Sequence, residues 1–186
     1  MARVLIIVAA GAEETETMTV ADILARAGQE VVIAGAKETR FPGSRQLPMA
    51  ADTTLDAVDP DSFDLIFLPG GMPQAENCRD DARIQAIIAR RLQDERPLAI
   101  MCASPMALLP NHLARGRRLT CFPALRDQLE AGGALWQDQA VVHDGCLITS
   151  QGPGTAMDLG LYLAEQLAGA AQAREIADQM LVPYPF

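Results

Sequence analysis

The chain has few of the side chains from which metal and disulfide sites are built. It contains two histidines and four cysteines, and no pair of them has the spacing of a zinc site or of a C-x-x-C motif. We therefore expect no metal, no other cofactor, and free thiols in a reducing compartment. The histidines are His112 and His143, and the cysteines are Cys78, Cys102, Cys121 and Cys146.

Long apolar runs and excess positive charge are also absent. The first apolar run, residues 4–8, is too short to span a bilayer, and no cleavable signal pattern precedes it. The formal net charge of -9 disfavours nucleic acid and anionic membranes as partners. The densest basic run, residues 115–118, is interpreted as a solvated turn. The 186 residues, of which 49% are hydrophobic, predict one cytoplasmic domain over residues 1–186.

Apolar runs alternate with helical patterns along the chain. The strands are apolar on both faces, which favours an α/β fold with a mostly parallel sheet and helices on both faces. In such a sheet ligands bind beyond the carboxyl ends of the strands, so the turns that follow them should converge. Strands are predicted at residues 4–9, 30–36, 64–68, 98–101 and 118–122, a loop or short hairpin at 40–51, a hairpin of residues 140–143 and 147–150, and helices at 14–27, 80–95, 153–167 and 170–180.

Cys102 is the most informative residue, because it stands where a buried strand should turn sharply into a helix. Ser104 suits the N-cap of that helix and Pro105 suits its first position. The unpaired N–H groups and the dipole of the helix favour a thiolate, so we expect a depressed pKa and a nucleophilic Cys102. The alternative is a small core residue, because free cysteine is often buried.

Glu16 projects from the apolar stripe of the first predicted helix, on the same face as Val20 and Ile23. Burial there should raise the pKa of its carboxyl group. The protonated acid can donate a hydrogen bond to a thiolate, and the carboxylate can accept a proton from a thiol or a substrate. The alternative is an acid that only stabilises the helix dipole, which fits Glu13 and Glu14 better.

Gly70 and Gly71 follow the third predicted strand, where glycines let backbone N–H groups approach a ligand closely. Together with the N–H of Ala103 they form a candidate oxyanion hole. A glycine pair alone most often only turns the chain. Residues 151–155 lack the spacing and the lysine of a phosphate-binding loop, and they are interpreted as a tight turn from strand to helix.

Four segments in combination resemble the ThiJ/PfpI superfamily, and within it the branch of the parkinsonism-associated deglycases and the YajL-like proteins. The resemblance implies a flavodoxin-like, doubly wound fold and usually a homodimer. It also implies Cys102 as the reactive, oxidation-prone thiol, Glu16 as the acid hydrogen-bonded to it, and Gly71 and Ala103 as oxyanion donors. The segments are Gly11-Ala-Glu-Glu-Thr-Glu16, Leu68-Pro-Gly-Gly71, Ala99-Ile-Met-Cys-Ala-Ser-Pro105 and Thr149-Ser-Gln-Gly-Pro-Gly-Thr155.

The same resemblance implies that Arg26, Arg45, Phe122 and Pro153 lie near the pocket or on the dimer side. Phe122 stands where the human-type pattern has a histidine. Peptidase-like members place a histidine directly after the nucleophile, and this chain has Ala103 there. No Cys–His dyad and no protease activity are therefore expected, and Glu16 is the best candidate base.

The resemblance leaves two functions open. The first is an enzyme acting on a small reactive aldehyde or a glycated substrate, of the glutathione-independent glyoxalase or deglycase type, which converts methylglyoxal to lactate. The second is a redox-sensing or chaperone-like stress-response dimer that uses oxidation of Cys102. A flavin-binding module is disfavoured by the thiol at the corner. The first two functions would share one site, so sequence motifs do not separate them.

Overall fold

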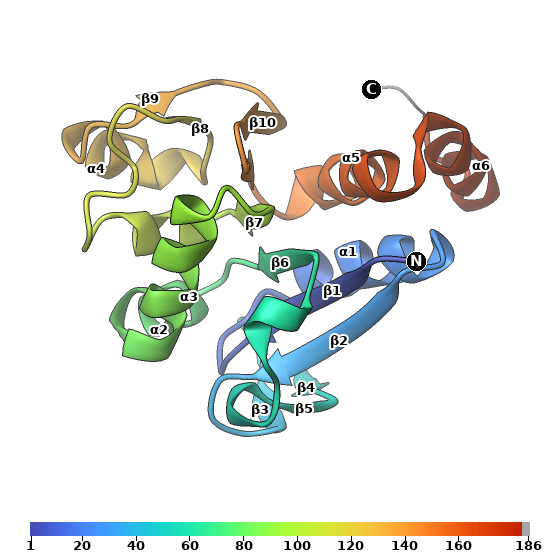
Figure 1. The fold of residues 1–186 in the computed structure, drawn as a ribbon, viewed down its shortest axis with the longest axis horizontal. Helices are drawn as coiled ribbons and strands as arrows, with labels where there is room; N and C mark the ends of the chain where they lie inside the picture. Colours follow the sequence, from blue (N-terminus) through green and yellow to red (C-terminus); the bar gives the residue numbers. More distant parts are fainter. Residues whose placement is uncertain (184–186) are drawn as a thin grey trace.

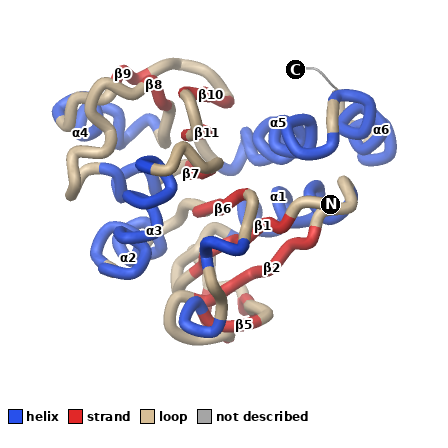
Figure 2. The backbone as a smooth tube through the Cα atoms, viewed as in Figure 1, coloured by secondary structure: helices blue, strands red, loops and turns tan. Residues whose placement is uncertain are grey.

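A seven-stranded sheet forms the centre of the molecule, and a computed structural model describes residues 1–183. Its strands are β1 (Arg3–Val8), β2 (Glu30–Gly35), β5 (Thr53–Thr54), β6 (Leu65–Leu68), β7 (Leu98–Met101), β10 (Val141–Asp144) and β11 (Leu147–Ser150). The order is β10-β11-β7-β6-β1-β2-β5 (Figures 1 and 2). Neighbours are parallel, apart from the antiparallel pair β10 and β11. The predicted mostly parallel sheet is therefore confirmed.

Helices cover both faces of the sheet (Figures 1 and 2). They are α1 (Glu14–Arg26), α2 (Gln74–Asp80), α3 (Ala82–Gln93), α4 (Arg126–Ala131), α5 (Ala156–Ala168) and α6 (Ala170–Met180). Side chains alternate along β1, so Leu5 packs with the α2, α3 and α4 side, and Val4 packs with α1 and α5. Helix α6 packs on the outer side of α1 and α5. This is the doubly wound, flavodoxin-like α/β fold.

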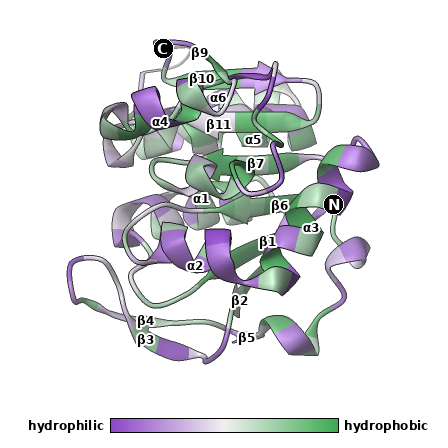
Figure 3. Cartoon of the chain, turned by 90° about the vertical axis from the view of Figure 1, so that its left-hand side faces the viewer, coloured by the Kyte–Doolittle hydropathy of each residue, from purple (hydrophilic) through white to green (hydrophobic). Residues whose placement is uncertain are grey.

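The hydrophobic core follows this layering. The central strands are the most hydrophobic part of the chain (Figure 3), and every residue of β6, β7 and β11 is buried. Two small sheets lie outside the central one: the hairpin of β3 (Arg40–Pro42) and β4 (Pro48–Ala50), and the parallel pair β8 (Arg118–Leu119) and β9 (Leu135–Trp136). Within residues 1–183, no helix is long and apolar enough to cross a bilayer.

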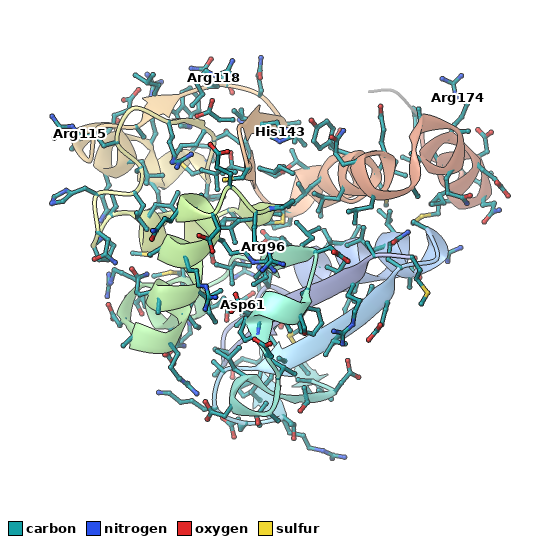
Figure 4. The ribbon with its side chains drawn as sticks, in the orientation of Figure 1. Asp61, Arg96, Arg115, Arg118, His143 and Arg174 are labelled. Carbon is teal, nitrogen blue, oxygen red and sulfur yellow. The ribbon has the colours of Figure 1, made fainter. Side chains whose placement is uncertain are left out.

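Two arginines fix the segment that leads into β6. Arg91, which is 2% exposed, donates hydrogen bonds to the carbonyls of Pro60 and Phe63. Its burial lowers the pKa of the guanidinium to about 10. Arg96 donates to the Phe63 carbonyl over 2.8 Å and pairs with Asp61 (Figure 4). These contacts therefore fix the start of β6, the strand that leads to Gly70 and Gly71.

Several predicted boundaries were wrong. The helix expected over residues 80–95 is α3, which starts at Ala82 because Asp81 caps it by accepting from the Arg83 N–H. The preceding helix α2 was not predicted. The strand expected over residues 118–122 stops at Leu119, because the chain then leaves the sheet and crosses to the end of β7. Residues 153–155 form a 3-10 turn ahead of α5.

Other expectations were confirmed. Residues 40–51 contain the short β3–β4 hairpin, and β10 and β11 form a hairpin around Asp144 and Gly145. Helix α1 ends at Arg26, and Gly28 follows it with a φ of 73°. The solvated turn predicted over residues 115–118 is confirmed only in part: Arg115 and Arg118 are exposed (Figure 4), but Arg118 is the first residue of β8 and pairs with Asp144 over 3.4 Å.

Candidate active site

Cys102 lies at the corner between β7 and a 3-10 helix, Ser104–Leu108. Its φ of 60° is in the left-handed region, which costs a residue with a side chain about 1–2 kcal/mol. Backbone hydrogen bonds hold the corner: the Cys102 N–H donates to the Ser150 carbonyl over 2.9 Å, and its own carbonyl accepts from the Phe122 N–H over 2.7 Å. Cys102 is 7% exposed. The fold thus presents one nearly buried thiol on a strained elbow.

The predicted capping of the following helix was wrong. Ala103 is the N-cap residue and Ser104 is already the first helical residue. The Ser104 hydroxyl is buried and donates to the Pro69 carbonyl over 2.6 Å, so it ties the elbow to the end of β6 instead of capping. The helix is a 3-10 helix of five residues, so its contribution to the field at the sulfur is small.

Glu16 lies in the first turn of α1 and is fully buried. Its Oε2 accepts the Gly70 N–H over 2.7 Å, whereas Oε1 has no hydrogen-bonding oxygen or nitrogen partner among residues 1–183. The Cys102 thiol is the group beside this carboxyl. Burial raises the pKa of Glu16 to about 7, and the nearby Glu13 charge adds to the rise. The predicted raised pKa is confirmed in direction.

The depressed pKa expected for Cys102 was wrong. Burial raises the pKa of this thiol, and the negative charge of Glu16 raises it further. The backbone N–H groups of Gly71 and Ala103 act in the opposite direction because they donate to the sulfur. Near neutral pH Cys102 therefore keeps its proton, and the group that titrates is Glu16, whose charge in turn opposes ionisation of the thiol.

The turn Gly70–Gly71 brings the carboxyl and the thiol together. A Cβ atom on Gly70 would overlap the Cβ of Cys102 and lie 2.9 Å from Glu16 Oε2. Gly71 has a φ of 94°, and a Cβ atom there would lie 2.7 Å from the Glu13 nitrogen. Because the Gly70 N–H is taken by Glu16, the expected set of three oxyanion donors reduces to Gly71 and Ala103.

A pocket of about 270 Å³ opens over the sulfur. Of the residues expected near it, Arg45, Phe122 and Pro153 line it together with Gly71, Cys102 and Ala103. Arg26 does not: it lies in the last turn of α1 and pairs with Asp22 over 2.8 Å. The residues that line the pocket are Glu13, Ser44, Arg45, Gly71, Met72, Cys102, Ala103, Phe122 and Pro153.

Sequence reasoning missed three lining residues. Glu13 was interpreted as a helix-start acid, which is confirmed: its Oε2 accepts the Glu16 N–H over 2.8 Å, and its side chain also faces the pocket. Met72 directly follows the glycine pair, so its position in the sequence could have indicated that it lies near the pocket. Ser44 comes from the loop between β3 and β4, and no local pattern links that loop to Cys102.

The remaining thiols lie outside this pocket. All four cysteines are free. Burial raises the pKa of Cys78 to about 12 and that of Cys121 to about 11. Residues 1–183 hold no group of three or more His, Cys, Asp or Glu side chains placed to bind a metal ion. A larger hollow of about 440 Å³ beside the β3–β4 hairpin contains no nucleophile.

Comparison with known proteins gives a consistent result. The sequence pattern of the DJ-1/PfpI family matches residues 2–166. The chain is 37% identical to Protein dj-1beta of Drosophila melanogaster, with 97% of each chain covered. It is 33% identical to Deglycase TK1284 of Thermococcus kodakarensis, with 88% of this chain and 96% of the relative covered.

Solved structures agree with the sequence comparison. The crystal structure of Drosophila melanogaster DJ-1beta superposes with a TM-score of 0.93 at 36% identity, covering 98% of this chain and 99% of that chain. Oxidized Toxoplasma gondii DJ-1 superposes with a TM-score of 0.91 at 35% identity, covering 99% of this chain and 100% of that chain. The similarity thus extends over the whole fold, including every element that positions Cys102 and Glu16.

Proposed function

Since the chain belongs to the DJ-1/PfpI family, we propose that it is a cysteine-dependent enzyme acting on small reactive aldehydes. The proposed reaction is that of a glutathione-independent glyoxalase or deglycase, with methylglyoxal converted to lactate. The observation that carries this proposal is the buried Glu16 carboxyl, with a pKa near 7, beside the Cys102 thiol at the floor of a pocket. An acid–base group works best when its pKa lies near the working pH.

The first proposed step is attack by sulfur on the aldehyde carbon. The Glu16 carboxylate takes the thiol proton, the Cys102 sulfur bonds to the aldehyde carbon, and the carbonyl oxygen becomes an oxyanion. The N–H groups of Gly71 and Ala103, which donate toward the sulfur in the free protein, support this charge. Protonation of the oxyanion by Glu16 gives a hemithioacetal and returns the carboxylate.

The second proposed step moves hydrogen between the two carbons. The Glu16 carboxylate removes the proton from the former aldehyde carbon and delivers it to the neighbouring ketone carbon through an enediol, while the hydroxyl proton moves from the oxygen of the first carbon to the oxygen of the second. The product is a thioester of lactate on Cys102. Water then hydrolyses the thioester, releases lactate and restores the thiol. The sum is methylglyoxal plus water giving lactic acid, so no external oxidant or reductant is needed.

A deglycase reaction would use the same first step. Adducts of methylglyoxal with amines or thiols are in equilibrium with a carbonyl form that sulfur can attack. The deglycase name of the Thermococcus relative supports this extension. Phe122, which lines the pocket, is 44% exposed, so part of the lining is open to solvent and to such an adduct.

The direct test is lactate production from methylglyoxal by the purified chain. We expect turnover by the parent and none by Cys102→Ala. Cys146→Ala is the matched control, because it removes a thiol that lies outside the pocket. Equal lactate production by Cys102→Ala and the parent would show that the reaction does not use this thiol.

The second candidate is a redox-sensing or chaperone-like stress-response role. It is supported by the free Oε1 of Glu16, which when protonated has a hydrogen to donate to an oxygen on an oxidised Cys102. In this role Cys102 would be oxidised without turning over an aldehyde. Oxidation by peroxide in a protein that produces no lactate would favour it over the enzyme.

We also propose a homodimer, a single domain over residues 1–186 and a cytoplasmic location. Exposed apolar side chains on α1 and on the loop after β3, Met18 and Leu47, support a self-association surface on this side of the molecule. Light scattering after size exclusion tests the dimer, and a monomer at micromolar concentration would contradict it.

A further inference from the structure

The loop between β3 and β4 is attached to the first turn of α1 through one carboxylate, Glu14. Its Oε1 accepts the backbone N–H groups of Arg45, over 2.8 Å, and Leu47, over 3.3 Å. Its Oε2 accepts the Ser44 hydroxyl over 3.1 Å. These hydrogen bonds lower the pKa of Glu14 against the effect of burial, so the group is a carboxylate at neutral pH. Three donors from one loop thus converge on a single charged side chain.

The loop is shaped to receive this carboxylate. A Cβ atom at Gly43 would overlap the carboxyl group of Glu14, so only glycine allows the approach. The loop is closed by the Gly43 N–H, which donates to the Leu47 carbonyl over 2.9 Å. It is also joined to the turn before α1, because the Ser44 N–H donates to the Ala12 carbonyl over 2.8 Å.

The attached loop forms one wall of the pocket over Cys102. Ser44 and Arg45 line this pocket, whereas Glu14 does not. Arg45 is exposed, and among residues 1–183 it forms no ion pair with a carboxylate. The contacts of Glu14 with Ser44, Arg45 and Leu47 therefore hold the backbone that carries the Arg45 side chain at the pocket wall.

We propose that Glu14 is a positioning residue that holds Ser44 and Arg45 against the pocket, and so sets how substrate binds without contacting it. The part of this inference that concerns substrate binding rests on the proposed function. The reacting groups are held by other contacts, namely those of Cys102 with Ser150 and Phe122 and that of Glu16 with Gly70. Loss of the Glu14 contacts should therefore weaken binding and leave the chemical step intact.

The kinetic test uses two independent disturbances of one contact. Glu14→Gln removes the charge, and Gly43→Ala pushes the carboxyl group away. Each should raise KM about tenfold, the size expected for one charge-assisted hydrogen bond, and change kcat less than about twofold. The double variant should be no worse than either single one, because both break the same contact. Glu30→Gln, which loses an exposed pair with Arg3, is the matched control.

A second measurement does not depend on turnover. Hydrogen exchange of the Arg45 and Leu47 amides should be at least tenfold faster in both variants than in the parent and in Glu30→Gln. Alkylation of Cys102 by iodoacetate relative to iodoacetamide reports the Arg45 charge near the sulfur. Gly43→Ala changes no charge, yet its ratio of iodoacetate to iodoacetamide alkylation should fall toward that of Arg45→Gln, because the loop that carries Arg45 is displaced.

The outcomes separate the two proposals. Unchanged amide exchange, or an unchanged alkylation ratio in Gly43→Ala, overturns the positioning role whether or not lactate is formed. A fall in kcat with constant KM also overturns it, because it would place Glu14 in the chemistry. No lactate from the parent, with faster amide exchange in both variants and a lowered alkylation ratio in Gly43→Ala, supports the positioning role and rejects the proposed reaction.

Discussion

The backbone N–H of Gly70 donates to Glu16 Oε2 over 2.7 Å, and this bond holds a buried carboxyl beside the Cys102 thiol. The same turn carries Gly71, whose N–H donates toward the sulfur. Both groups are buried, and a negative charge on one opposes a negative charge on the other. The backbone N–H groups of Gly71 and Ala103 offset only part of this repulsion at the sulfur. In the proposed reaction the Glu16 carboxylate accepts the proton of this thiol.

Removal of the Glu16 charge should accelerate alkylation of Cys102 at high pH. In the parent the ionised Glu16 opposes formation of a thiolate, and Glu16→Gln abolishes this repulsion. At pH 9 we expect iodoacetamide to modify Cys102 about tenfold faster in Glu16→Gln, as measured by peptide mass spectrometry. A slower reaction would mean that Glu16 stabilises the thiolate as a proton donor even at this pH.

Glu16 should also make stability depend on pH in a defined direction. Its pKa is about 7 in the folded protein against 4.5 when exposed, so the folded state binds the proton more tightly. The resulting stabilisation is fully present below pH 4.5 and is lost as the pH rises through 7. Relative to Glu16→Gln, the parent should lose about 3 kcal/mol of unfolding free energy between these values.

Urea unfolding of both proteins at pH 5, 6, 7 and 8 measures this difference. Groups distant from Glu16 titrate equally in the two proteins, so their effects cancel in the comparison. A difference in unfolding free energy that stays constant across the series would show that Glu16 does not change its protonation in this range.

Mild peroxide should take Cys102 to the sulfinate and stop there. Two equivalents of hydrogen peroxide each transfer one oxygen to the sulfur and leave as water. Protonated Glu16 and the N–H groups of Gly71 and Ala103 can bond the new oxygens, at about 1.5–3 kcal/mol for each charge-assisted bond. Intact mass should show a gain of two oxygens at Cys102, and Glu16→Asp should change the product because its carboxyl reaches less far.

The competing product is a disulfide. A bond between Cys102 and Cys121 as the main outcome would mean that the pocket does not stabilise a sulfinate and that Cys121 acts as a resolving thiol. Cys146→Ala serves as the control, because Cys146 directly precedes β11, whereas Ser150, whose carbonyl accepts the Cys102 N–H, lies at the other end of that strand.

Local patterns were sufficient for the parts of the site that depend on one element. The apolar run before Cys102 placed this residue at a strand end, and the apolar stripe that includes Glu16 placed that residue in the first turn of the helix after a strand, and a parallel sheet brings such positions together. The pKa of Cys102 was beyond reach from local reasoning, because it depends on the position of Glu16, which is 86 residues earlier in the chain. Desolvation and the neighbouring carboxylate raise the pKa of the thiol by more than the N-terminus of a short helix lowers it.

Tertiary contacts decided the other differences. Serine is a common N-cap residue, yet the buried hydroxyl of Ser104 donates a hydrogen bond to the Pro69 carbonyl, just after the end of β6. The loop with Ser44 and Arg45 reaches the pocket through Glu14, and residues 30 or more apart in sequence leave no periodic signal. The strand predicted after residue 118 ends early because the Phe122 N–H bonds the Cys102 carbonyl.

The central claim is that Glu16 moves protons for the Cys102 thiol during conversion of methylglyoxal to lactate. Its most direct test is kcat/KM of Glu16→Gln, a variant that keeps the size of the side chain but cannot exchange a proton. We predict a fall of about 10²- to 10⁴-fold with a normal melting temperature. Full activity of a folded Glu16→Gln would contradict the account.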